Sequence, residues 1–138
     1  MCLGLCCNFF VFFCVTLCHF AFTLNLAQFR NNLNFYYFNA RSLLAISDYG
    51  IPRTDLLQAF CNIEQTVDLV AITETHLDAT IGEDELNIDD FTLFRNDRLR
   101  GGRHGGGVLL YVRDTLQPTI IAINNNEIES LFVLINNG

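Results

Sequence analysis

Apolar residues between positions 33 and 135 occur in short consecutive runs that are separated by turn residues. Residues 33–38 form an aromatic-rich apolar run, and residues 67–73 form a second apolar run without aromatic residues. Consecutive apolar positions are typical of strands that are covered on both faces, whereas strict alternation is typical of half-exposed strands. The pattern therefore predicts two buried strands here. Later runs of the same kind predict four more, at residues 91–95, 108–112, 119–123 and 131–135.

Between the first two predicted strands, the spacing of apolar residues changes to that of a helix. Leu56, Phe60 and Ile63 recur at helical intervals, Thr54 is a suitable N-cap, and Asp55 is favourably placed in the first turn. We predict one amphipathic helix over residues 54–66. A strand, a helix and a strand in succession predict a right-handed crossover that makes the two strands parallel.

The first 29 residues have a different character from the rest of the chain. They contain no charged side chain, since the first is Arg30, and they hold five of the six cysteines among many phenylalanines. About 20 apolar residues suffice to cross a bilayer, so this hydrophobic leader can be a signal anchor. The alternative is that residues 1–29 are translated upstream sequence rather than part of a domain. We therefore expect the globular part to be residues 30–138.

Length and charge limit the functions that the chain can have. A chain of 138 residues allows one domain with one core. The net charge of −7 argues against indiscriminate binding to the DNA backbone, so any contact with nucleic acid must be local. The chain has eight arginines and no lysine. One basic cluster lies in a glycine-rich stretch, which either bends around a phosphate or is a solvated loop. The cluster consists of Arg95, Arg98, Arg100, Arg103 and His104.

Two polar residues lie where the first two predicted strands end. Asn39 closes the first strand, and Glu74 follows the second. Because neighbouring parallel strands end at the same edge of a sheet, an amide and a carboxylate can meet there and hold a divalent cation and a phosphate. Residue types alone favour plainer roles, with Asn39 capping a strand end and Glu74 a surface acid.

Four motifs, in a fixed order and spacing, give these residues more weight. They are Asn39-Ala-Arg-Ser-Leu43, Ile72-Thr-Glu-Thr-His-Leu77, Asn96-Asp-Arg98 and Gly105-Gly-Gly-Val-Leu-Leu-Tyr-Val-Arg113. Together they resemble the start of the endonuclease/exonuclease/phosphatase domain that non-LTR retrotransposons carry, which is related to apurinic/apyrimidinic repair endonucleases. The resemblance covers residues 33 to about 135.

The resemblance implies a fold, a cofactor and a set of site residues. It implies a four-layer α/β sandwich of the DNase I type and a magnesium-dependent nuclease that acts on DNA in the nucleus. Glu74 and Asn39 match the family's catalytic and metal-holding positions, and Arg41 and Arg98 match positions that face nucleic acid, although Arg98 can also pair with Asp97 or with the acidic loop at residues 78–90. His76 matches a variable position that lines the site.

The chain also departs from the family pattern. The later Gly-Asp-x-Asn and Ser-Asp-His segments, which supply the water-activating aspartate and a phosphate-binding histidine, do not occur in the 138 residues. We therefore expect a truncated domain that is inactive alone and that self-associates through exposed sheet edges. The alternative function is a small membrane-anchored interaction protein. No basic import signal is visible, so the compartment stays open.

Overall fold

A computed structural model describes residues 8–16, 19–24, 33–98, 105–121 and 129–136 of the chain. Two four-stranded sheets and one α-helix make up most of this part, so the fold is of the α/β type that the sequence predicts. The elements in chain order are β1 (Asn8–Thr16), β2 (His19–Leu24), β3 (Phe35–Asn39), α1 (Arg53–Ile63), β4 (Leu69–Thr73), η1 (Glu83–Glu85), β5 (Phe91–Asn96), β6 (Val108–Arg113), η2 (Asp114–Leu116), β7 (Thr119–Ile120) and β8 (Glu129–Asn136).

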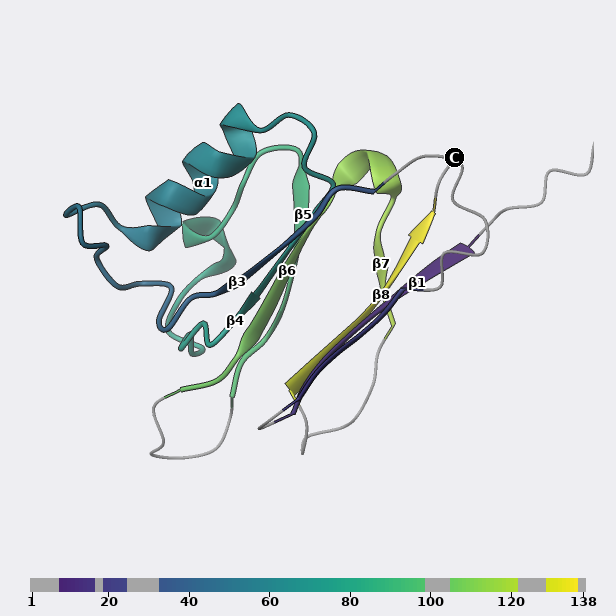
Figure 1. Cartoon of the computed structure of the whole chain (residues 1–138), viewed down its shortest axis with the longest axis horizontal. Helices are drawn as coiled ribbons and strands as arrows, with labels where there is room; N and C mark the ends of the chain where they lie inside the picture. The colour runs from purple at the N-terminus through teal and green to yellow at the C-terminus, as the bar shows by residue number, and fades with distance from the viewer. Residues whose placement is uncertain (1–7, 17–18, 25–32, 99–104, 122–128, 137–138) are drawn as a thin grey trace, which may run out of the picture.

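The candidate site belongs to the sheet with strand order β3-β4-β6-β5. Strands β3 and β4 are parallel, with Asn39 opposite Thr73, which confirms the predicted strand–helix–strand unit. Strand β6 is antiparallel to both β4 and β5. Helix α1 lies over one face of this sheet, and the second sheet lies over the other face (Figure 1). Strand β4 therefore runs through the middle of three layers.

The second sheet has the strand order β2-β1-β8-β7. Its central pairing joins the hydrophobic leader to the end of the chain, because β1 and β8 are antiparallel with Val11 opposite Val133. The leader thus contributes strands β1 and β2, and in the described ranges no helix has the length and apolarity needed to cross a membrane. A membrane anchor in residues 1–29 stays a prediction.

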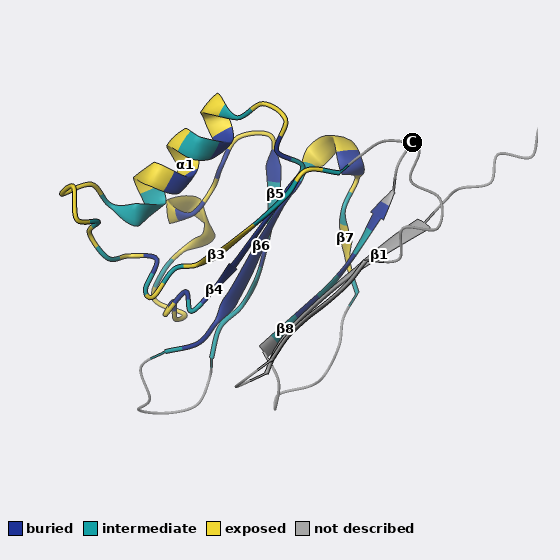
Figure 2. Cartoon of the chain, in the orientation of Figure 1, coloured by how far each residue is buried: buried dark blue, intermediate teal, exposed yellow. Residues whose placement is uncertain are grey.

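Buried side chains form two clusters, one on each face of the β3-β4-β6-β5 sheet. Figure 2 shows that β4 and β6 are buried along most of their length. The cluster between the two sheets joins Leu69, Ala71 and Leu110 to Val133 and Ile135 of β8. The other cluster fills the space under α1. All five residues of β4 are buried, as are five of the six in β6, which confirms that these consecutive apolar runs are strands covered on both faces.

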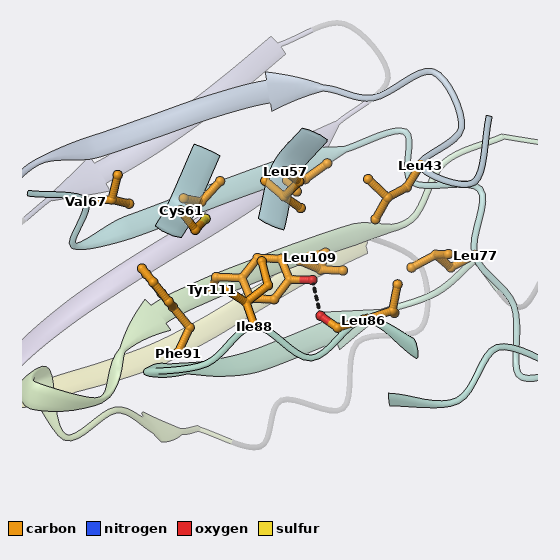
Figure 3. Packing of buried hydrophobic residues seen from close by; sticks show 12 residues of the cluster. Leu43, Leu57, Cys61, Val67, Leu77, Leu86, Ile88, Phe91, Leu109 and Tyr111 are labelled. Atoms are coloured by element: carbon orange, nitrogen blue, oxygen red, sulfur yellow. Dashed lines mark hydrogen bonds between the residues drawn. The ribbon is translucent and has the colours of Figure 1, made fainter. Parts of the chain in front are cut away.

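Tyr111 of β6 shows how a polar atom is accommodated in the cluster under α1 (Figure 3). Its ring is 1% exposed, and its hydroxyl donates a 2.6 Å hydrogen bond to the backbone oxygen of Leu86. Burial raises the pKa of Tyr111, so the hydroxyl stays protonated and remains a donor. The bond ties β6 to the loop after η1.

Burial also raises the pKa of the Cys61 thiol, to about 11, although the positive charge of Arg113 opposes this.

Strand β3 differs from the prediction. Its apolar run suggests burial on both faces, but Tyr37 and Phe38 are 41% and 40% exposed. The reason is position, because β3 is an edge strand and Phe38 lies close to the end of the sheet. The apolar run reflects composition, and it does not tell which strand lies at an edge. Self-association through such an edge stays a prediction.

Helix α1 also differs in its start and in its buried face. It begins at Arg53 after Pro52, and Thr54 makes no capping hydrogen bond, so the predicted N-cap is wrong. Leu57 and Cys61 are the buried residues, whereas Leu56 is 40% and Ile63 82% exposed. The helix is therefore rotated relative to the predicted apolar face, because the sheet meets the stripe of Leu57 and Cys61.

Some sequence predictions fall partly outside the described residues. Strand β7 covers only Thr119–Ile120 of the strand predicted at residues 119–123. Residues 122 and 123 lie outside the described residues. Arg100, Arg103 and His104 of the basic cluster lie outside the described residues.

Neighbouring leucines of α1 test the observed orientation of the helix. We expect Leu57→Ala to lower the free energy of unfolding by about 2 kcal/mol or more, because it leaves a cavity against the sheet. Leu56→Ala, one residue away with the same change of side chain, should cost less than about 1 kcal/mol. Urea unfolding followed by circular dichroism measures both. Equal losses, or a larger loss for Leu56→Ala, would contradict the orientation.

Candidate functional site

The predicted site residues come together at the edge of the sheet where β3 and β4 end. Backbone pairing continues beyond the two strands, since the amide of Ala40 donates to the oxygen of Thr73 (2.9 Å) and the amide of Ser42 to that of Glu74 (2.8 Å). On the other side of β4, the amide of His76 donates to the oxygen of Gly106 (2.9 Å). Residues 74–76 are thus held between the loop after β3 and the glycine loop before β6.

The backbone at this edge is strained. Six non-glycine residues in the described ranges have positive φ angles, and four of them are here: Arg41, Ser42, Glu74 and His76, with φ of 46°, 81°, 52° and 55°. Each such residue costs about 1–3 kcal/mol, and it persists only where the surrounding structure enforces it. Strain of this kind clusters at binding and catalytic sites. The observed outliers therefore mark this edge as a candidate site independently of the residue types.

The carboxylate of Glu74 is fixed by two hydrogen bonds to one of its oxygens. Oε2 accepts the backbone N–H of Gly106 at 2.9 Å and lies 3.2 Å from Nε2 of His76. The Gly106 N–H lowers the pKa of Glu74 most, partial burial opposes this, and His76 and the positive charge of Arg98 lower it further. The side chain is still 36% exposed. Glu74 is therefore ionised, oriented and accessible to a ligand from solvent.

Asn39 lies at the same edge, exposed at the end of β3. Its Oδ1 accepts a 3.2 Å hydrogen bond from the amide of Arg41, which turns the chain sharply after the strand. The guanidinium of Arg53, from the start of α1, donates to the backbone oxygens of Ala40, Arg41 (2.9 Å) and Ser42 (3.2 Å). The helix thus clamps the loop that carries Asn39.

The two predicted nucleic-acid contacts have different positions. Arg98 reaches the glycine loop, where its guanidinium lies over Gly106 and its charge acts on Glu74. Arg95 pairs with Asp97 and binds the acidic loop through the oxygens of Ile81 (2.8 Å) and Asp78 (2.9 Å). The structure thus places Arg98 at the site.

Arg41 is exposed and borders a cavity of about 360 Å³ between β3 and α1. Phe38, Leu56 and Phe60 are among its apolar lining residues, and Asn39 and Arg41 also line it. The cavity is large enough for a small organic group. It reaches the surface beside the edge where the strands end.

Sequence reasoning missed two residues that build the site. Gly106 holds Glu74 through its backbone, and Arg53 holds the Asn39 loop, yet neither role follows from a side-chain motif. The three consecutive glycines were the available signal. Their positive φ angles of 121°, 81° and 83° show why glycine is needed.

The ligand set fits a hard cation that keeps most of its water. Within the described part of the chain, no group of three or more His, Cys, Asp or Glu side chains could enclose a metal ion. A single oriented carboxylate, with the amide of Asn39 at the end of the neighbouring strand, suits magnesium, which prefers oxygen ligands and often binds through one or two carboxylates plus water. The fit is therefore to an open site rather than to a closed structural site.

Comparison of the chain with family models, with curated proteins and with solved structures finds no match.

The environment of Glu74 predicts its titration. We expect its carboxyl to titrate below the ordinary value of 4.5, because the Gly106 N–H and His76 stabilise the ionised form. A depressed folded-state pKa adds stability above the unfolded-state pKa, and this stability is lost as the pH falls through the folded-state value. Carbon-13 NMR of the carboxyl measures the midpoint directly.

His76→Ala should raise that midpoint only in part, because the larger contribution, from the Gly106 amide, remains. A Glu74 midpoint at or above 4.5 in the unmodified chain would show that the described hydrogen bonds do not form in solution.

Proposed function

We propose that this chain carries the cation- and phosphate-binding part of a magnesium-dependent DNA endonuclease of the retrotransposon endonuclease/exonuclease/phosphatase type. The observation that carries the proposal is that Asn39 at the end of β3, Glu74 just past the end of β4 and Arg98 over the glycine loop lie at one strained edge of one sheet. The sequence separates these residues by up to 59 positions, so folding is what assembles them. Their order and chemistry are those of the resembled family.

The layer arrangement is compatible with the proposed family. Helix, sheet and sheet lie in succession across the described part of the chain. They correspond to three of the four layers of the DNase I-like sandwich that we propose for the domain. In this arrangement the site lies where β3 and β4 end, at the edge of the β3-β4-β6-β5 sheet, which α1 covers on one face.

Each residue has a defined part in the proposed chemistry. Glu74 would hold the magnesium ion, which neutralises negative charge on the phosphate and polarises bound water. Asn39 would orient a bound water or a phosphate oxygen through its amide. The guanidinium of Arg98 would donate to phosphate oxygens, since a planar guanidinium matches their geometry. Arg41, at the border of the cavity, would contact the nucleic-acid backbone further along.

The charge distribution supports local rather than general binding of DNA. The chain carries a net charge of −7, yet Arg41, Arg53 and Arg98 all lie around this edge. Magnesium bound to Glu74 would add two positive charges to the same place. Phosphate binding should therefore depend on the cation, because the rest of the surface repels DNA.

Cation binding is the direct test of the proposal. We expect the chain to bind Mg²⁺ or Mn²⁺ in calorimetric titration and Glu74→Gln to weaken this binding by at least about tenfold, because it removes the anionic ligand. Glu83→Gln, the same change on the exposed short helix η1, should leave the affinity unchanged. Equal affinities of the unmodified chain and Glu74→Gln would exclude Glu74 as the ligand.

DNA provides the second readout. We expect binding of a short DNA duplex to increase when Mg²⁺ is added, and we expect little or no nicking of supercoiled plasmid, because the 138 residues lack the family's later catalytic segments. Asn39→Ala should reduce the increase that magnesium causes. If the unmodified chain nicks the plasmid and Glu74→Ala nicks it equally well, the proposed role of Glu74 is contradicted.

A further inference from the structure

The glycines at positions 105, 106 and 107 meet different neighbours, and only at Gly106 would a Cβ atom overlap a charged side chain. A Cβ atom on Gly105 would lie at ordinary distances of 3.6 Å from Oε2 of Glu74 and Nε2 of His76. A Cβ on Gly107 would overlap the hydroxyl of the buried Thr75. A Cβ on Gly106 would overlap three atoms of the Arg98 guanidinium. The bare Cα of Gly106 thus leaves room for the charged end of Arg98.

We infer that Gly106 is a positioning residue: it seats the Arg98 guanidinium beside the Glu74 carboxylate, ready to receive a phosphate. This inference rests on the proposed function. Two contacts of the same residue carry it, since the Gly106 N–H donates to Glu74 at 2.9 Å while its Cα face meets Arg98. One glycine therefore sets the relative position of a cation ligand and a phosphate ligand.

The sign of the coupling follows from the charges. A cation on Glu74 and the guanidinium of Arg98 repel each other until a phosphate lies between them and neutralises both. Arg98 should therefore oppose binding of Mg²⁺ alone, yet it should strengthen binding of DNA when Mg²⁺ is present. A variant that displaces Arg98 should bind Mg²⁺ alone no more weakly than the unmodified chain, but it should bind DNA more weakly when Mg²⁺ is present.

Gly106→Ala is such a variant, and the chain provides a matched control. Alanine at position 106 would push aside the far end of a flexible side chain rather than the backbone, so Arg98 can move without unfolding the site. Gly50 has a similar φ, +76° against +81°, but a Cβ there would meet nothing within 4 Å. Gly50→Ala therefore places alanine at a similar left-handed φ without a clash with Arg98.

The experiment compares the affinity of the whole chain for a short DNA duplex in the presence of Mg²⁺. We expect Gly106→Ala to weaken binding by about tenfold and to reduce the salt dependence by about one phosphate contact. Arg98→Gln should have the same effect, and adding Gly106→Ala to Arg98→Gln should weaken binding no further. Gly50→Ala should leave DNA affinity unchanged. Fully additive effects of Gly106→Ala and Arg98→Gln would overturn the inference.

A second measurement needs no ligand. In nitrogen-15 NMR spectra, Gly106→Ala should shift the Nε–H resonance of Arg98. The through-space signal between this Nε–H proton and the α-proton of residue 106 should disappear. Gly50→Ala should cause neither change. An Arg98 resonance that is unchanged in Gly106→Ala would overturn the inference even if no DNA binds. Failure of the unmodified chain to bind Mg²⁺ would instead refute the proposed function, so the two failures are distinguishable.

Discussion

Backbone hydrogen bonding along β4 is the constraint on which the rest of the structure depends. It continues past Thr73 on both sides, so that residues 74–76 are held between the loop after β3 and the glycine loop before β6. Because each flanking loop is bound to this extension, their positions are not independent of each other. Glu74 and His76 accept left-handed backbone angles there because the pairing outweighs the local cost. The candidate site is a consequence of this pairing.

The electrostatics of the site follow from the same geometry. The Gly106 amide reaches Glu74 only because the glycine loop is bound to His76, and this amide is the largest influence that keeps the carboxylate ionised. Arg98 lies over the same glycine. In a chain with a net charge of −7, this oriented anion beside a guanidinium is the local charge arrangement on which the proposed function rests.

The sequence predicts the centre of the β3-β4-β6-β5 sheet well, because consecutive apolar residues there do indicate strands that are buried on both faces. Strands β4 and β6 are apolar at almost every position and are buried on both faces. The same rule failed for β3, where Tyr37 and Phe38 are exposed at an edge, since composition cannot say which strand has a neighbour on each side. It also could not distinguish Leu56 from Leu57, because adjacent apolar residues on a helix leave the buried stripe undetermined until the sheet is in place. Among the site residues, Asn39 and Glu74 could be named from their places at strand ends. Gly106 donates its backbone N–H to Glu74, and the guanidinium of Arg53 binds backbone oxygens, so neither contact pairs two side chains that a motif could reveal.

The most direct test of this account is to locate a bound cation. Crystals of the chain with Mn²⁺ in place of magnesium, measured at the manganese absorption edge, would show the ion as an anomalous peak. The account predicts a peak within coordinating distance of a Glu74 carboxylate oxygen, on the side of the site that faces Asn39. A well-occupied peak elsewhere, with ordered water alone beside Glu74, would contradict it.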